Sequence, residues 1–492
     1  MTFRTTSALT FTLLSLSLLG CTVGPDYLRP ATAVPVSFKE IKGWKQAQPL
    51  DNQLPGKWWE VFEDSQLNAL EQQVDQANQS IAQAEAQYRQ AQTLVQSAAA
   101  AYFPTATATT TVNRFRAATG QSVAVSGVKY LFGGAVSALW APDLWGGVRR
   151  QVEASEVSAQ ASFATLQGLR LTTQAALAQS YFQLRVLDAQ IKLLNETVAT
   201  YDKTIRITQN RYAAGIVAKT DVVQAETQLE STRAQAINLG VQRAQLEHAI
   251  AVLIGKTPAE LSIALAPLNT LLPAIPASLP SQLLERRPDI AAAERLAAAA
   301  NAQIGVAKAA YFPNLNLAAS DGQQATLLSN LLTSGARYWA LGPAAFAIPL
   351  FDGGARGARM QQAVAAYDAS VAAYRQTVLV SFQQVEDNLA ALRILEQEVA
   401  IQNKAVAAAH QAVQLTTNQY QAGTVSYLNV MVNQVAALAN QKIAVDLQGQ
   451  RLNASVLLVQ ALGGGWNVAA LPTQDQAGGE VKWSQFLPIP LK

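Results

Sequence analysis

Apolar residues recur at alternating steps of three and four along several long parts of the chain. One run extends from Leu67 to Ala98, and a second extends from Leu177 to Ile205 and has a copy 208 residues later. This spacing is a heptad repeat, in which one stripe of a helix faces a partner helix. A helix over residues 148–212 would be about 100 Å long at 1.5 Å per residue. A compact core does not require that length, so the pattern predicts an extended coiled coil.

Two other segments, 128–140 and 338–348, alternate with a period of two. Apolar bands of about ten residues with aromatic side chains near both ends are typical of strands in membrane barrels. Partner strands are predicted over 105–113 and 314–320. A pair of soluble surface hairpins is the alternative interpretation of these segments.

Three landmarks occur twice at a nearly constant separation of 208 or 209 residues. They are Tyr-Phe-Pro at 102 and 311, Asn-x-Tyr-x-Ala-Gly-x-Val at 210 and 418, and glycine at 255 and 463. The period is too long for a solenoid, so it indicates duplication of a domain-sized unit. Each unit is predicted to contain a helix, a strand pair (104–141 or 313–350) and a long helical hairpin. The predicted organisation is a signal peptide at 1–20, an N-terminal linker at 21–65, repeats at 66–255 and 281–464, a connector at 256–280 and a tail at 465–492.

Four strands are too few to close a barrel. An open sheet edge in lipid leaves backbone groups unsatisfied, at a cost of several kcal/mol each. If these strands cross a membrane, several copies of the chain must therefore pool them. The number of copies does not follow from this reasoning.

The N-terminus predicts a lipid anchor. Arg4 precedes an apolar stretch at 7–20, which is too short to span a bilayer and fits a cleaved secretory signal. The stretch ends in Leu-Leu-Gly before Cys21, which resembles the lipobox of bacterial lipoproteins, and Cys21 is the only cysteine of the chain. We expect Cys21 to be the acylated first residue of the mature protein. A cysteine lost with the signal is the alternative.

Composition excludes several classes of function. Only 14% of the 492 residues are charged, 50% are hydrophobic, and the net charge of +3 gives no reason to expect a nucleic-acid partner. His248 and His410 are isolated on predicted helices, and no phosphate-binding loop, nucleophile elbow or cysteine pair is present. We therefore expect no enzyme activity, no cofactor and no metal site.

Several motifs resemble those of one family. They are 21–27 (Cys-Thr-Val-Gly-Pro-Asp-Tyr) with Arg-Pro at 29–30, Trp-Trp at 58–59, Arg-Arg-Pro-Asp-Ile at 286–290, both Tyr-Phe-Pro motifs, and Phe-Asp-Gly-Gly at 351–354. In this order they resemble the TolC-like outer membrane efflux protein family, in its OprM/NodT-type lipoprotein branch. The resemblance implies a mainly α fold with a transmembrane β-barrel: a homotrimer with 12 strands and a coiled-coil helical barrel that extends into the periplasm. Around its middle, an equatorial domain would combine 21–65, 256–280 and 465–492.

The resemblance also implies the function. Such proteins are lipid-anchored exit ducts in the outer membrane, and Thr22 after the cysteine fits the family's rule for sorting there. They accept cargo such as drugs from an inner-membrane pump of the RND or MFS type through a periplasmic adaptor, and the helix tips open like an iris. Two alternatives stay open: a type I protein-secretion duct, and a structural coiled-coil lipoprotein without a channel.

Functional residues are expected at the helix tips. Gly215, Val217, Gly423 and Val425 are candidate contacts for the adaptor, although the sequence fits a simple role in ending the helices equally well. The resemblance places the gate at Tyr420, Leu428, Asn429 and Val432, with Asp221 at the equivalent place in the first repeat. Relatives often have aspartates at the last two gate positions. Because this chain has Asn429 and Val432 at those positions, we predict a constriction that is closed mainly by apolar contact.

Overall fold

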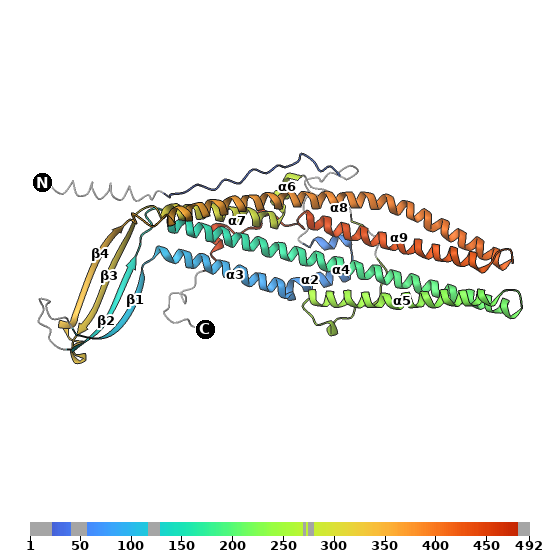
Figure 1. Cartoon of the computed structure of the whole chain (residues 1–492), viewed down its shortest axis with the longest axis horizontal. Coiled ribbons are helices and arrows are strands. Elements are labelled where there is room, and N and C mark those ends of the chain that lie inside the picture. The colour runs from blue at the N-terminus through green and yellow to red at the C-terminus, as the bar shows by residue number, and fades with distance from the viewer. Residues whose placement is uncertain (1–21, 41–56, 117–127, 269–271, 274–279, 481–492) are drawn as a thin grey trace.

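Long helices extend side by side from the sheet to the opposite end of the molecule (Figure 1). The computed structural model describes residues 22–40, 57–116, 128–268, 272–273 and 280–480. Helices α4 (Gly147–Ala213) and α8 (Ala355–Gln421) have 67 residues each, and α5 (Lys219–Leu253) and α9 (Tyr427–Ala461) have 35 each. Equivalent ends lie 208 residues apart, at 147 and 355 and at 219 and 427. The predicted mainly helical fold with two long hairpins is therefore confirmed.

The shorter helices differ from the sequence prediction. The heptad run from Leu67 forms two helices, α2 (Ser65–Ala77) and α3 (Gln79–Ala99), and not one. Asn78 makes the break, because its side-chain oxygen accepts hydrogen bonds from the backbone N–H groups of residues 80 and 81. In the second repeat the break lies between α6 (Pro280–Arg286) and α7 (Pro288–Ala309), where a proline begins the second helix.

The repeated glycines fit tightly against these breaks. Gly255 (φ +72°) and Gly463 (φ +95°) follow the second helix of each hairpin. A Cβ at Gly255 would lie 2.2 Å from the carbonyl oxygen of Ala77, and one at Gly463 would lie 2.1 Å from that of Arg286. Both the left-handed backbone and the close approach require glycine. The two repeats thus use the same joint between hairpin and short helix.

One antiparallel sheet extends from the end of the helices (Figure 1). Its strands are β1 (Thr105–Arg116), β2 (Val128–Trp140), β3 (Asn314–Ala325) and β4 (Arg337–Ala347). The pairing of β2 with β3 joins the two repeats. All four predicted strands are present, and the partner strands extend to 116 and 325, beyond their predicted ends. Strands β1 and β4 form the edges of this sheet.

The two faces of the sheet have different chemistry. The register places large apolar side chains on one face, here called the outer face, which includes Val112, Phe132, Val136, Trp140, Trp339, Leu341 and Phe346. The opposite, inner face carries mostly small and polar residues, among them Thr105, Thr107, Thr109, Thr111, Ser137, Ser320 and Asn316. Side chains that alternate in this way suit lipid on one side and water on the other.

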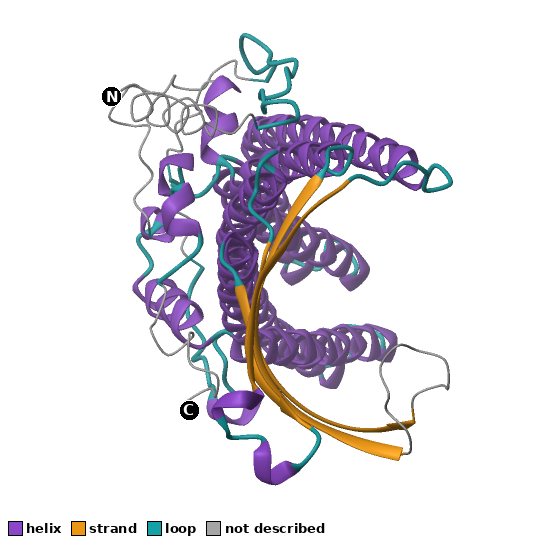
Figure 2. Ribbon diagram, turned by 90° about the vertical axis from the view of Figure 1, so that its left-hand side faces the viewer, coloured by secondary structure: helices purple, strands orange, loops and turns teal. Residues whose placement is uncertain are grey.

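The inner face of the sheet is the concave one, because atoms on it lie closer together than atoms on the outer face. A Cβ at Gly133, on the inner face, would lie 3.0 Å from Thr111 Oγ1, and one at Gly322 would lie 2.7 Å from the carbonyl oxygen of Gly134. A Cβ on the outer face at Gly134 would meet no atom within 4 Å. In Figure 2 the sheet is curved, and the long helices follow the same arc. The polar face therefore points toward the centre of the arc.

The main core lies near the middle of the molecule, where the N-terminal segment meets the long helices. Trp58, Trp59 and Phe62 of the short helix η1 (Trp58–Phe62) are almost fully buried, and Phe62 lies 5.0 Å from Phe182 of α4 between ring centroids. The other short elements are η2 (Ala100–Tyr102), η3 (Pro258–Glu260), η4 (Leu328–Asn330), η5 (Ser334–Ala336), η6 (Val468–Ala470) and α10 (Gln474–Ala477).

Buried ion pairs hold the connector against this core. Asp188 of α4 is 2.6 Å from Arg185 and 2.7 Å from Arg243 of α5. Arg185 also donates to the carbonyl oxygen of Ala264, and Arg243 donates to that of Ile263. The charges of these buried groups are therefore compensated, and their remaining donors fix the path of the connector. Among the described residues, none of the helices has both the length and the apolar composition needed to cross a membrane.

Glu71 of α2 generates a prediction about stability. Its carboxyl group is fully buried without a hydrogen-bond partner, and burial, with a smaller effect of Asp75, raises its pKa from 4.5 to about 9. The folded protein keeps this proton while the unfolded chain releases it above pH 4.5, so Glu71 lowers stability progressively from about pH 4.5 to 9. Glu71→Gln should be more stable than wild type at pH 8 and nearly equal to it at pH 4.5.

Thermal unfolding followed by circular dichroism at both pH values measures this difference. Glu226→Gln, at an exposed position of α5, is the matched control and should leave the pH dependence unchanged. An identical pH dependence in wild type and Glu71→Gln would contradict the assignment of this proton to Glu71.

Candidate functional site at the helix tips

Both helical hairpins reverse at the end of the molecule opposite the sheet (Figure 1). Gly215 and Gly423 have φ values of +72° and +78°, in the left-handed region. The N–H groups that follow them donate back to residues 211 and 419, at 2.9 and 3.0 Å. This geometry ends helices α4 and α8 and turns the chain into α5 and α9. It accounts for both glycines as helix-ending residues.

A small apolar cluster, here called the tip cluster, joins the two hairpins near these turns. Its buried members are Tyr201, Ile205, Ala225, Leu229, Tyr420, Tyr427 and Val430. Val217 and Val425 are half-buried and pack against this cluster. Part of their apolar surface is therefore covered by contacts within the chain.

Arg211 of the first hairpin contacts the second hairpin. Its guanidinium carbon lies 4.7 Å from the ring centroid of Tyr420, and Nη1 donates a 2.5 Å hydrogen bond to the carbonyl oxygen of the same residue. Thr208 of α4 lies 3.4 Å from the Tyr420 hydroxyl. Since Tyr420 belongs to α8, these contacts connect the ends of the two longest helices. We call the Arg211–Tyr420 contact the tip latch.

Sequence reasoning missed Arg211. The equivalent residue of the second repeat is Gln419, within the otherwise similar motifs at 210–217 and 418–425. A difference in charge inside a repeated motif was the available signal. Its meaning depends on Tyr420 of the other repeat, which lies beside Arg211 only in the folded chain.

Tyr427 extends the cluster into α9. Its ring centroid lies 5.7 Å from that of Tyr420 at an interplanar angle of 62°, an edge-to-face arrangement. Burial raises the pKa of Tyr427 to about 12, and the nearby tyrosines and Asp221 add to this effect. Tyr427 is therefore neutral at physiological pH. Asp221 itself is half-buried in the first turn of α5.

The predicted gate residues occupy two different environments. Tyr420 is buried in the tip cluster. Leu428 (49% exposed), Val432 (56% exposed) and Asn429 instead lie on a free surface of α9. Positions 428 and 432 are one helical turn apart, so they share one face. The chain thus presents an apolar pair at the tip, next to a polar amide.

At the other end of the helices, the first described residues lie at the junction with the sheet. The backbone N–H of Val23 donates to the carbonyl oxygen of Trp145 at 3.1 Å, and Arg149 donates to the Thr22 hydroxyl at 3.2 Å. The Trp145 ring stacks on Phe312 with centroids 4.8 Å apart. The signal peptide and Cys21 lie outside the described residues. Thr22, the residue after Cys21, is thus held by Arg149, and the residue after it is bonded to the backbone of Trp145.

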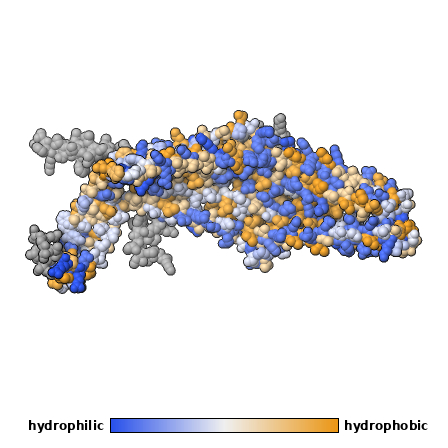
Figure 3. All heavy atoms as spheres, viewed as in Figure 1, coloured by the Kyte–Doolittle hydropathy of each residue, from blue (hydrophilic) through white to orange (hydrophobic). Residues whose placement is uncertain are grey.

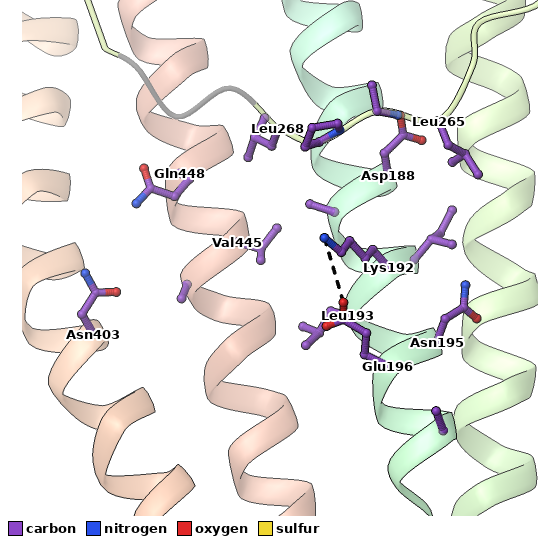
Figure 4. Close-up of a pocket in the computed structure, with 16 residues that line it drawn as sticks. Asp188, Lys192, Leu193, Asn195, Glu196, Leu265, Leu268, Asn403, Val445 and Gln448 are labelled. Carbon is purple, nitrogen blue, oxygen red and sulfur yellow. Dashed lines mark hydrogen bonds and ion pairs between the residues drawn. The ribbon is translucent and has the colours of Figure 1, made fainter. Parts of the chain in front are cut away.

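A groove of about 920 Å³ lies between α4, α9 and the connector. Leu193, Leu265 and Val445 contribute apolar surface, and Lys192 and Glu196 form an ion pair of 4.0 Å on α4 (Figure 4). The groove is open to solvent and lies beside Asp188 of the buried ion pairs. Its long charged side chains, Lys192 and Glu196, lie along the surface of one helix and are paired with each other.

Both histidines are exposed side chains on long helices. His410 has its Nε2 2.9 Å from the amide nitrogen of Gln441, and His248 lies on α5. Within the part of the chain that the structure describes, no group of three His, Cys, Asp or Glu side chains is arranged to hold a metal ion.

Comparisons with known proteins agree with this geometry. The family model described as outer membrane efflux protein matches residues 70–256 and 279–464. The toluene efflux pump outer membrane protein TtgC of Pseudomonas putida is 30% identical, over 97% of this chain and 99% of that protein. The cation efflux system protein CusC of Escherichia coli is 28% identical, over 92% and 97%.

The solved structure of the outer-membrane channel OprN superimposes with a TM-score of 0.85 at 29% identity, and the match covers 91% of this chain and all of that one. The family match spans both repeats, and the structural match includes helices and sheet together. The chain is therefore a member of the outer membrane efflux protein family.

Proposed function

We propose that three copies of this chain form the exit duct of a tripartite efflux system, with a barrel of 12 strands in the outer membrane. The observation that carries this proposal is the four-stranded sheet, which has two free edges, an apolar outer face and a polar inner face. Pooled strands would satisfy both edges and leave the inner face in contact with water. A structural lipoprotein without a channel gives no reason for such a sheet.

Cargo would enter at the helix tips. A periplasmic adaptor would contact the two hairpin turns and deliver the cargo. An inner-membrane pump would supply the energy. The named relatives concern toluene in one case and cations in another. We propose small molecules such as drugs or solvents as cargo, because the inner face offers hydroxyl and amide groups without a built binding site.

The resting gate is proposed to close by apolar contact. Leu428 and Val432 are exposed in one chain, so they are free to meet the same residues of neighbouring copies around the axis. Asn429 adds no charge to this ring. The tip latch would hold the two hairpins of each copy together in the closed state, since Arg211 and Tyr420 belong to different hairpins.

Acylation of Cys21 would anchor each copy. The hydrogen bond from Val23 to the backbone of Trp145 supports this proposal, because it places the start of the mature chain near a tryptophan, and aromatic residues gather at the level of the lipid headgroups. A lipid on the preceding residue would therefore emerge at the membrane surface. Several acyl chains together give stable attachment, at about 0.8 kcal/mol per buried methylene.

Conductance in a planar bilayer tests the duct and its gate. The purified wild-type oligomer should give small, long-lived channels, and Val432→Ala should increase the resting conductance severalfold because it removes apolar contact at the constriction. Val223→Ala, an exposed valine of α5, is the matched control. A folded oligomer without conductance would contradict the duct, and unchanged conductance in Val432→Ala would contradict the apolar gate.

The tip latch generates a separate prediction. Arg211→Ala removes the cation–π contact with Tyr420 and the hydrogen bonds from Nη1 to the carbonyl oxygens of Tyr420 and Gln421, together worth about 2 kcal/mol. If the latch forms only in the closed state, the open population should rise about thirtyfold. Single-channel open probability is the measurement. Arg206→Ala, an exposed arginine of α4 that pairs with Asp202, should behave as wild type. Equal open probabilities in both variants would exclude a latch.

The anchor is tested by mass spectrometry of the mature N-terminus. Wild type should begin at Cys21 and carry fatty acids, whereas Cys21→Ala should carry none. The sheet should still hold the variant in the membrane, so it should stay in the pellet after carbonate extraction. A wild-type N-terminus at any other residue would overturn the assignment.

A further inference from the structure

The charged residues of the sheet gather at one end. Within 104–141 and 313–350 the charged residues are Arg114, Arg116, Lys129, Asp321 and Arg337. All five lie in the half of their strands that is remote from the helices. Figure 3 shows hydrophilic side chains at this far end, beyond a paler part of the sheet. The remote end of the sheet is therefore cationic.

The strand register separates these charges by face. Arg114 pairs with Tyr130 and Arg116 pairs with Val128, and all four lie on the apolar outer face. Lys129 pairs with Phe115 on the inner face. The two arginines are thus placed toward lipid, and the lysine is placed toward the centre of the arc.

Only one of the outer-face cations has an acidic partner. Arg337 forms an ion pair of 3.0 Å with Asp321. Within the described residues, Arg114 and Arg116 pair with no carboxylate, and residues 117–127 carry no charged side chain in the sequence. Arg114 lies over Tyr130 at 5.5 Å, and Tyr130 stacks on Phe132 at 6.0 Å. Two uncompensated guanidinium groups therefore border an aromatic surface.

The height of this pair in the membrane follows from the length of the strands. Ten steps along β2 separate Trp140 from Tyr130, which gives about 33 Å along the strand and about 25 Å across the membrane at a tilt of about 40°. That distance matches the apolar band of an outer-membrane barrel. Because the helices extend into the periplasm, Arg114 and Arg116 lie at the headgroup level of the outer leaflet.

We propose that Arg114 and Arg116 bind the phosphate group of a phosphorylated glycolipid in the outer leaflet, while Tyr130 and Phe132 contact its acyl chains. This inference rests on the proposed outer-membrane duct. The guanidinium group matches phosphate oxygens with two parallel hydrogen bonds. The apolar surface directly below the arginines fits a phosphate that is attached to hydrocarbon, whereas free phosphate would use only the upper part of the site.

The site also lies where copies of the chain would meet. Strand β1 is an edge of the sheet, and among the described residues it pairs only with β2. In a closed barrel this edge pairs with the β4 edge of a neighbouring copy. A lipid bound at Arg114 and Arg116 would cover that junction and stabilise the oligomer against dissociation.

Heat dissociation of the delipidated oligomer, read on denaturing gels, tests the site, and native mass spectrometry counts the bound lipid. The probes are lipid A with two phosphates, the same lipid without phosphate, and inorganic phosphate, all with a chelator present. Lipid A should raise the dissociation temperature of wild type. The double variant Arg114→Ala/Arg116→Ala should need about thirtyfold more lipid A for the same shift.

Two variants serve as controls. Lys129→Ala removes one positive charge at the same height from the inner face and should bind as wild type. Arg114→Lys/Arg116→Lys keeps the charge and should bind with intermediate affinity. The site is overturned if the double alanine variant binds lipid A as wild type does, or if Lys129→Ala loses as much. Equal binding of the dephosphorylated lipid, or an equal shift with inorganic phosphate alone, also overturns it.

Conductance of the same samples separates this test from that of the duct. A wild-type oligomer that conducts and a conducting double variant that no longer binds lipid A support the site. Wild type without conductance contradicts the duct, and lipid A binding by native mass spectrometry then still decides the site.

Discussion

The free edges of one small sheet are the constraint on which the rest of this molecule depends. Each backbone N–H or C=O group without a partner costs several kcal/mol in hydrocarbon, and β1 and β4 each present a row of them. A single copy therefore cannot place its sheet in a membrane. Pooling strands from several copies removes the edges, and the helices that follow each strand pair must then lie around the same axis. The duplication supports this arrangement, because it gives every copy two equivalent hairpins below one sheet.

The chain is held more firmly at its middle and at the sheet junction than at its tips. Large aromatic side chains and compensated ion pairs fill the core around Trp58 and Asp188. At the junction, Trp145 stacks on Phe312, and its carbonyl oxygen accepts a hydrogen bond from the N-terminal segment. The tip cluster has only a few buried side chains and one charged contact between hairpins. Because local stability follows buried contacts, the tips are the part of the described chain that opens at the smallest cost in free energy.

Much of the fold was predictable because periodicity is a local signal. Heptad steps identified the long helices, and alternation identified the strands near 128–140 and 338–348. Three landmarks at a nearly constant separation, among them the glycines at 255 and 463, identified the duplication. The break at Asn78 was not predicted, since its apolar neighbours continue the same heptad steps on both sides. At the candidate site, the turn glycines were visible in the sequence. The roles of Arg211 and Glu71 were not, because each depends on side chains that only folding brings near.

The two repeats agree where geometry is fixed and differ at the tips. Gly255 and Gly463 meet equivalent carbonyl oxygens because both hairpins join a short helix in the same way. On the second helix of each hairpin, Leu428 and Val432 of α9 correspond to Thr220 and Gln224 of α5. A ring built from such chains would alternate apolar and polar sectors at its narrow end. In the proposed ring, only the apolar sectors would gain free energy from mutual contact when water leaves the constriction, so α9 rather than α5 would close it.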